Sequence, residues 1–195
     1  MSVSDYMQNR TLNILFIGNL HQSKGLFDLL HSIPDVTAIN PKVHYWIAGE
    51  WTSDIERRQA MQILSEHDIE KYVTFLGLVT GEEKIEFFMQ GDVLVHPTHY
   101  DGQPLVILEA MSVGLPIIST NVGSIMETIE DGKNGYIVPT NKPNKIAEAI
   151  LKFSSNESLL NEMGQKSKTI FNYRFKDAVF VKRVSKIFQD ILTLK

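Results

Sequence analysis

The sequence contains no cysteine, and this absence excludes a disulfide framework and any metal site built from thiolates. It is typical of a protein kept in a reducing compartment, so we expect a cytoplasmic location. No apolar run approaches the roughly 18 residues that a membrane-spanning helix needs. Residues 1–10 are too polar for a signal peptide. Any contact with a membrane is therefore expected to be peripheral, at its inner face.

The sequence also lacks the charge and the glycine motifs of several nucleotide-binding and nucleic-acid-binding classes. Its net charge is −4, without the basic excess that marks a nucleic-acid-binding protein. The segment from Gly18 to Gly25 follows a predicted strand but matches neither G-x-G-x-x-G nor G-x-x-x-x-G-K-[ST]. These absences argue against a dinucleotide-dependent dehydrogenase, a P-loop NTPase and a partner of nucleic acid.

What the chain does contain is an alternation of short apolar runs and longer helical patterns, in a length that suits one domain. Near-continuous apolar strands separated by helices are typical of a parallel sheet covered on both faces. We therefore predict a doubly wound, Rossmann-like α/β fold with a mostly parallel sheet and helices on both faces. The expected strands cover residues 12–18, 43–48, 72–76, 93–96 and 116–119, and the expected helices cover 25–33 (ending near Pro34), 53–67, 82–90, 105–111, 145–151, 159–170 and 175–192.

Two carboxylates, Asp101 and Glu109, stand where such a fold binds its ligand. Ligands of doubly wound sheets lie at the carboxyl ends of the strands. Asp101 falls in a loop of this kind, and Glu109 lies in the second turn of the helix expected just after Pro104. Backbone N–H groups at a helix start can bind phosphate, and carboxylates accept hydrogen bonds from sugar hydroxyls. The combination indicates a sugar nucleotide as ligand.

The stretch from Tyr100 to Met111 resembles the paired-acid signature of retaining glycosyltransferases with the GT-B fold, in the large family four. In that family two glutamates have the spacing of Asp101 and Glu109. Further landmarks of the family follow one another in order over residues 12–140. They are F-I-G-N-L at 16–20 with K-G at 24–25, I-A-G at 47–49, F-L-G at 75–77, D-V-L-V-H-P-T at 92–98, G-L-P-I-I at 114–118 and N-G at 134–135.

Members of that family have two doubly wound domains, and the chain resembles the second, which binds the donor. The resemblance implies transfer of a hexose-type sugar from a UDP- or GDP-sugar to a glycan or lipid acceptor, with the anomeric configuration retained and without cofactor or metal. It implies surface polysaccharide or glycolipid synthesis as the setting. We divide the chain into an extension (1–11), a donor-binding domain (12–172) and a C-terminal helix (173–195). That helix would pack on an N-terminal acceptor domain supplied in cis or in trans, without which the isolated chain is expected to transfer little sugar.

The resemblance gives three charged residues a catalytic role. Lys24 would stabilise the negative charge of the leaving diphosphate. Glu109 would accept hydrogen bonds from the ribose, and Asp101, which replaces the family's glutamate, would contact the donor sugar. Asn19 replaces an arginine that is usual in the family, so the phosphate site has one cation fewer. The expected donor contacts are completed by Gly18, Asn19, Leu78, Val79, Gly102, Gln103, Pro104 and Leu105, of which Leu78 and Val79 would hold the base.

Each acid or cation also has a purely structural interpretation. Lys24 is compatible with a solvated surface lysine, Glu109 with a favourable helix-dipole contact, and Asp101 followed by Gly102 with ordinary turn chemistry. Two other functions therefore stay open. One is a stand-alone sugar-nucleotide-binding subunit that is completed by a separate acceptor polypeptide. The other is an epimerase-like enzyme of the same fold.

A metal site is a further possibility, because His96, His99 and Asp101 form the pattern H-x-x-H-x-D. Two histidines in a strand-to-loop segment need not converge, and no fourth ligand is evident nearby. We therefore expect no metal at these residues.

Overall fold

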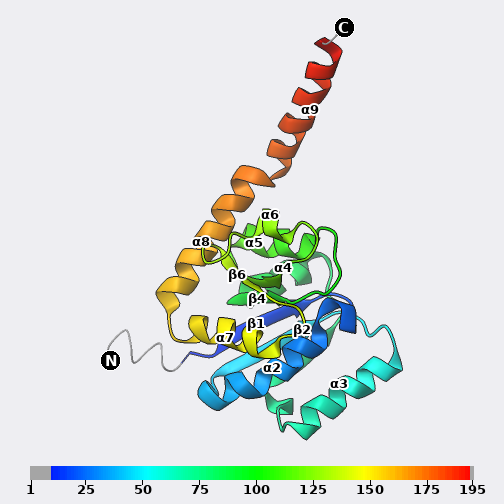
Figure 1. Cartoon of the computed structure of the whole chain (residues 1–195), viewed down its shortest axis with the longest axis vertical. Helices are drawn as coiled ribbons and strands as arrows, with labels where there is room; N and C mark the ends of the chain where they lie inside the picture. Colours follow the sequence, from blue (N-terminus) through cyan, green and yellow to red (C-terminus); the bar gives the residue numbers. More distant parts are fainter. Residues whose placement is uncertain (1–9, 194–195) are drawn as a thin grey trace.

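The computed structural model describes residues 10–193 and the side chains of residues 10–189. At its centre lies a six-stranded parallel sheet of order β3-β2-β1-β4-β5-β6 (Figure 1). The strand order reverses between β1 and β4, as in doubly wound folds. The predicted fold class is therefore confirmed. The strands are β1 (Leu12–Ile17), β2 (Val43–Ala48), β3 (Val73–Gly77), β4 (Val93–His96), β5 (Ile117–Thr120) and β6 (Gly135–Val138).

Alternate side chains of β1 point to opposite faces of the sheet and enter two separate cores. Ile14 and Phe16 pack with α2, α3 and α7, whereas Leu15 and Ile17 pack with α4, α5 and α6. Helix α8 lies against α5 and α7. The helices are η1 (Gln22–Lys24), α2 (Leu26–Ile39), α3 (Asp54–Glu66), η2 (Glu70–Tyr72), α4 (Gly81–Gln90), α5 (Leu105–Val113), α6 (Ile125–Thr128), α7 (Pro143–Ser154), α8 (Glu157–Arg174) and α9 (Asp177–Thr193).

Helix α2 continues past Pro34 to Ile39, so the predicted end near Pro34 is wrong. A proline inside a helix removes one backbone donor and usually breaks the helix. Here Ile33 and Val36, on either side of the proline, are fully buried, and α2 packs along α7. Each such aliphatic side chain contributes about 1.5–3 kcal/mol on burial. Burial of this helix face therefore outweighs the lost hydrogen bond.

Strand β6 lies in a segment for which the sequence pattern predicts no strand. It has only four residues and begins with Gly135, and it pairs with β5 at the edge of the sheet. A Cβ atom on Gly135 would lie 1.9 Å from the carbonyl oxygen of Ile117, so only glycine fits this contact. The other expected elements are present, with ends that differ by at most four residues from the predicted ones.

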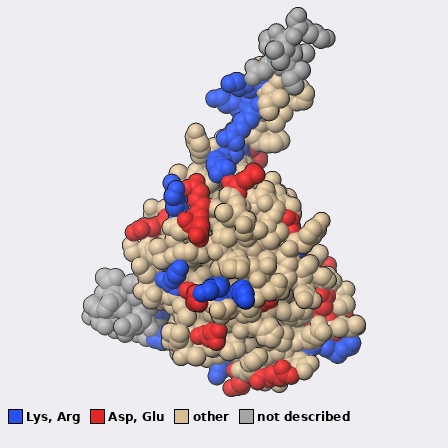
Figure 2. All heavy atoms as spheres, in the orientation of Figure 1, with Lys and Arg blue, Asp and Glu red and all other residues tan. Residues whose placement is uncertain are grey.

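Helix α9 extends away from the sheet beyond the end of α8 (Figure 1). Its side chains Phe180, Val181, Ile187 and Phe188 are between 57% and 65% exposed. Figure 2 shows basic side chains gathered on one side of this helix. No helix within residues 10–193 is long and apolar enough to cross a membrane.

The predicted division at residues 172 and 173, and the packing of the last helix on another domain, stay predictions. Residues 1–9 of the predicted extension and residues 194–195 of the predicted C-terminal helix lie outside the described part of the chain. The described end of the extension is attached to the sheet, because Arg10 forms an ion pair with Asp92.

Candidate functional site

A cavity of about 730 Å³ opens at the carboxyl ends of β1, β2 and β3. Its volume lies within the roughly 300–1,000 Å³ of typical small-molecule sites. Helices α4 and α5 close its sides with Lys84 and Glu109. Five predicted donor-binding residues come together in its walls: Gly18, Asn19, Leu78, Val79 and Glu109.

The other predicted site residues lie outside these walls, in the loops that follow β1 and β4. These loops flank the point where the strand order reverses, which is where ligands of doubly wound sheets bind. Two other cavities border Arg10 and Asp92 and measure about 50 and 430 Å³. Neither is lined by a predicted site residue. The residues outside the walls are Lys24, Asp101, Gly102, Gln103, Pro104 and Leu105.

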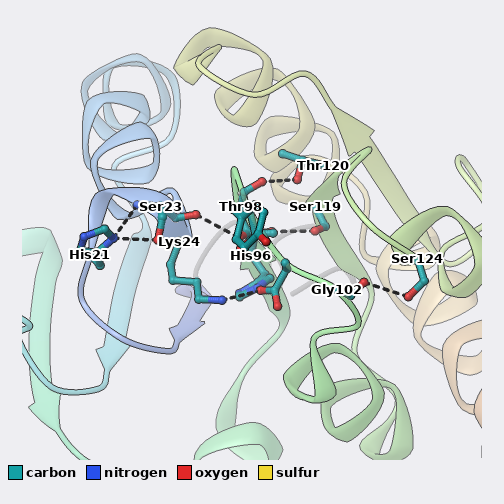
Figure 3. A network of polar contacts seen from close by, with 11 residues as sticks. His21, Ser23, Lys24, His96, Thr98, Gly102, Ser119, Thr120 and Ser124 are labelled. Atoms are coloured by element: carbon teal, nitrogen blue, oxygen red, sulfur yellow. Dashed lines mark hydrogen bonds and ion pairs between the residues drawn. The ribbon is translucent and has the colours of Figure 1, made fainter.

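Lys24, His96 and Asp101 form a contact group, which we call the Asp101 cluster. Lys24 Nζ lies 2.8 Å and His96 Nε2 lies 3.1 Å from the same carboxylate oxygen, Oδ2 of Asp101. The His96 side chain is 2% exposed and that of Asp101 is 16% exposed. Figure 3 shows Lys24 and His96 approaching from different elements, the η1 turn and the end of β4. The predicted lysine and the predicted loop acid are therefore direct partners in the ligand-free protein.

Both partners favour the ionised form of the Asp101 carboxyl. The hydrogen bond from His96, with a smaller contribution from Lys24, lowers its pKa to about 2, although partial burial acts in the opposite direction. Since the ionised carboxylate can only accept hydrogen bonds, the proton of the hydrogen bond between His96 and Asp101 is on Nε2 of the histidine. Nδ1 of His96 is buried without a hydrogen-bond partner among the described residues.

Polar side chains at the ends of β4 and β5 fix the loop that carries Asp101. Thr98 donates through Oγ1 to the carbonyl oxygen of Ser23, at 3.1 Å, and the backbone N–H of His99 donates to the same oxygen at 2.8 Å. Ser119 donates to the carbonyl of His96 and Thr120 to that of Thr98 (Figure 3). The loop is thus tied both to the Lys24 turn and to the neighbouring strand. The sequence signal for these ties is the pair of hydroxyl residues that ends the otherwise apolar strand β5.

The loop before α5 packs closely against the turn that precedes α6. Ser124 donates to the carbonyl of Gly102 through its backbone N–H, at 2.8 Å, and through its hydroxyl, at 3.1 Å. Gly123 has φ +55°, and a Cβ atom there would lie 2.2 Å from the Asp101 carbonyl oxygen. Within this loop Pro104 is buried, whereas Gln103 and Leu105 are exposed. Helix α5 begins at Leu105, as predicted.

Glu109 has a partner that the sequence did not indicate. Lys84, in the first turns of α4, places Nζ 2.8 Å from Oε1 and 2.7 Å from Oε2 of Glu109. Both side chains remain partly open, at 30% and 41% exposure. A basic residue early in the helix after β3 is the only sequence signal for this pair, and it is a weak one.

His99 turns away from the Asp101 cluster. Its Nε2 lies 2.7 Å from Asp28 Oδ2, in α2, so His99 does not converge with His96 on a common point. Within residues 10–193 no group of three or more histidine and acidic side chains could hold a metal ion.

Solved structures of known proteins share the fold at low sequence identity. Anabaena Alr3699/HepE in complex with UDP superposes with a TM-score of 0.86 at 18% identity, and the match covers 97% of this chain and 54% of that one. The C-terminal domain of a glycosyl transferase group 1 family protein (LpcC) from Francisella tularensis gives a TM-score of 0.79 at 22% identity, over 89% of this chain and 91% of that one. At such identities the likeness shows the fold alone.

Proteins that are similar in sequence identify the family. Spore coat protein SA of Bacillus subtilis (strain 168) is 33% identical over 163 residues, which are 80% of this chain and 42% of the relative. The putative glycosyltransferase YtcC of the same organism is 29% identical over 93% of this chain and 46% of its own length. The chain thus spans about half the length of these relatives, or less. The family model described as "Glycosyl transferases group 1" matches residues 8–170, and the chain belongs to that family.

Proposed function

We propose that this chain is the C-terminal, donor-binding half of a retaining GT-B glycosyltransferase. The enzyme moves a hexose-type sugar from a nucleoside diphosphate sugar, UDP- or GDP-linked, to a glycan or lipid acceptor in surface polysaccharide or glycolipid synthesis. The observation that carries the proposal is the placement of Glu109 in a nucleotide-sized cavity at the carboxyl ends of the strands, with the Lys24–Asp101 ion pair in the loops at the reversal of strand order.

The chemistry assigned to the three charged residues follows from the charge that moves in the reaction. As the bond between the sugar C1 and the phosphate oxygen breaks, negative charge builds on the leaving diphosphate, which Lys24 stabilises. Asp101 contacts the donor sugar, and Glu109 accepts hydrogen bonds from the ribose hydroxyls. The acceptor oxygen bonds to C1 on the face that the phosphate leaves, and its proton passes to a phosphate oxygen. No metal takes part in this scheme.

Two of the comparisons support a donor-binding half. The Anabaena protein is described in complexes with UDP, with UDP and glucose, and with UDP-glucose. The Francisella structure, of which this chain matches 91%, is described as a C-terminal domain. In our proposal Leu78 and Val79 hold the base, and the loop of Gly102 to Leu105 borders the sugar.

A thermal-shift panel with UDP, GDP, ADP and their sugar conjugates tests the donor site. A ligand at 100 times its Kd adds about 2.7 kcal/mol to the free energy of unfolding. For a chain of this size that is an increase of about 5–11 °C in Tm. We expect a shift with UDP or GDP and with its sugar conjugates. No shift with any compound of the panel would contradict the proposal.

The exposed apolar residues of α9 favour an acceptor domain that packs on this helix, in cis or in trans. The purified chain is therefore expected to bind its donor and to transfer little sugar to any acceptor. Robust glycosylation by the chain alone would overturn this part of the proposal. Co-purification with a separate acceptor-domain polypeptide would instead identify a natural subunit. Epimerisation of the donor sugar without an acceptor would favour the epimerase-like alternative.

A further inference from the structure

We infer that Lys84 is a positioning residue for nucleoside recognition, because it holds the carboxylate of Glu109 toward the donor's ribose. The inference rests on the proposed function and assigns a task to a residue outside the Lys24–Asp101 pair. Lys84 and Glu109 both line the 730 Å³ cavity, and they come from two different helices, α4 and α5. Their contact therefore fixes one side chain of the cavity wall against another.

Lys84 holds the carboxylate by one hydrogen bond and by close ionic contact with both oxygens. Nζ of Lys84 donates to Oε1 at 2.8 Å and lies 2.7 Å from Oε2. A free glutamate side chain samples several rotamers and loses this freedom when it binds a ligand. Contact with Lys84 removes part of that freedom before the nucleoside arrives, and such preorganisation favours binding.

The carboxylate keeps acceptor capacity for the ligand. Two carboxylate oxygens offer about four lone-pair positions. Oε2 is buried and accepts no hydrogen bond from the residues that the structure describes, and a buried acceptor without a partner is costly. A ribose supplies two neighbouring hydroxyl donors for this carboxylate. The backbone below Glu109 is fixed, because Ile107, Ala110 and Met111 of the same helix are buried in the core.

The charges of the cavity wall support the same role. Among the residues that line the cavity, Lys84 is the one cation, and Glu50 and Glu109 are the acids. Without Lys84 the nucleoside diphosphate would meet two uncompensated carboxylates, which repel its phosphates. Lys84 thus both orients Glu109 and offsets its charge, in a site where Asn19 provides no cation.

The test uses the full chain and compares a ribonucleoside diphosphate with its 2′,3′-dideoxy form by calorimetry, starting with UDP and then GDP. Hydrogen bonds to a charged acceptor are worth about ten- to a hundredfold in affinity. We expect the wild-type chain to prefer the ribose form by about tenfold or more, and K84M to reduce this preference to about threefold or less. Arginine keeps the positive charge and can contact both carboxylate oxygens, so K84R is expected to keep most of it.

Two controls separate positioning from a merely structural contact. K145M removes a more exposed ion pair, Lys145–Glu148 in α7, and should leave the ribose preference unchanged. In an E109Q background, K84M should produce no further loss of preference, since it acts through Glu109. A substitution that only lowers stability would change Tm but not the ratio of the affinities for the ribose and 2′,3′-dideoxy forms.

The outcomes distinguish the inference from the proposed function. If the wild-type chain binds no nucleoside diphosphate, both fail. If it binds and prefers ribose but K84M keeps the full preference, the proposed function stands and the inference is wrong. The inference is also wrong if K84M binds UDP or GDP more tightly than the wild-type chain, because Lys84 would then cover Glu109 rather than present it.

Discussion

The two predicted acids are held by the protein in different ways. Asp101 is 16% exposed, lies in a loop fastened to two neighbouring segments, and has two cationic or proton-donating partners. Glu109 is 41% exposed, lies on a helix that borders an open cavity, and has one partner, Lys84. The Asp101 carboxylate is thus fastened by the fold before a ligand arrives, whereas Glu109 faces an open cavity. Substitution of Asp101 should therefore lower stability, and substitution of Glu109 should lower binding with little effect on stability.

The largest effect is expected from Gly25→Ala, which separates the Lys24 turn from the Asp101 loop. Gly25 has φ +74°, and an added Cβ atom would lie 2.0 Å from the Pro97 carbonyl oxygen. Left-handed backbone costs an alanine about 1–2 kcal/mol, and overpacking adds about 1–3 kcal/mol. Gly132→Ala is the matched control, because Gly132 has the same φ with open space around it. Urea unfolding should show a loss of about 3–4 kcal/mol for G25A and about 1–2 kcal/mol for G132A. Equal losses would mean that the contact between the two loops carries no stability.

Lys24→Ala is expected to have the second-largest effect, and this effect is mainly on ligand binding. A charge-assisted hydrogen bond to phosphate is worth about 1.5–3 kcal/mol, so affinity for UDP or GDP should fall about ten- to a hundredfold. Affinity for the nucleoside without phosphates should change little. Calorimetry with both compounds measures the difference. Equal losses for nucleoside and nucleoside diphosphate would contradict a phosphate role for Lys24.

Asp101→Asn should lower the free energy of unfolding in a pH-dependent way. The pKa of Asp101 is lowered to about 2 in the folded protein, from its usual value of 3.8. Its contribution to stability is therefore present above pH 3.8 and is lost as the pH falls through about 2. With allowance for solvent screening, we expect D101N to cost about 1–2 kcal/mol at pH 7.

Urea unfolding at pH 7 and near pH 2 measures this dependence. The difference between wild type and D101N should shrink at the lower pH, because the carboxylate is then about half protonated in the folded protein and almost fully protonated in the unfolded chain. Glu148→Gln, in an exposed ion pair, is the control and should differ little from the wild type. A D101N deficit that is constant with pH would indicate a packing defect instead of lost charge interactions.

The fold was predictable because its strands are buried on both faces and appear as continuous apolar runs. The two errors, the end of α2 and the missed strand β6, occur where tertiary contacts and not the local sequence pattern decide the structure. At Pro34 a strong local helix-breaking signal lost to the burial of Ile33 and Val36 against α7, which only the tertiary structure reveals. Strand β6 has little apolar pattern of its own and is specified by its edge pairing with β5.

The candidate site was predictable only in part, for a related reason. The position of a residue after a strand places it at the ligand edge, and this locates Gly18, Leu78 and Asp101. Side-chain pairing depends on which elements become neighbours. Lys24 and Asp101 are 77 positions apart, and Lys84 and Glu109 are 25 positions apart, so no local spacing reports either contact. The role of each pair in binding is still a prediction.

The smallest effect on stability is expected from Glu109→Gln, the counterpart of D101N in the other half of the site. Partly exposed ion pairs contribute about 0–1 kcal/mol, since solvent screens them and their side chains lose rotamer freedom. Urea unfolding of E109Q and K84M at pH 7 should therefore stay within about 1 kcal/mol of the wild type, while the ribose preference is lost. A stability loss as large as that of D101N would mean that the Glu109 pair also fastens α4 to α5. The contrast between an acid fastened by the fold and an acid held by one screened ion pair would then be wrong.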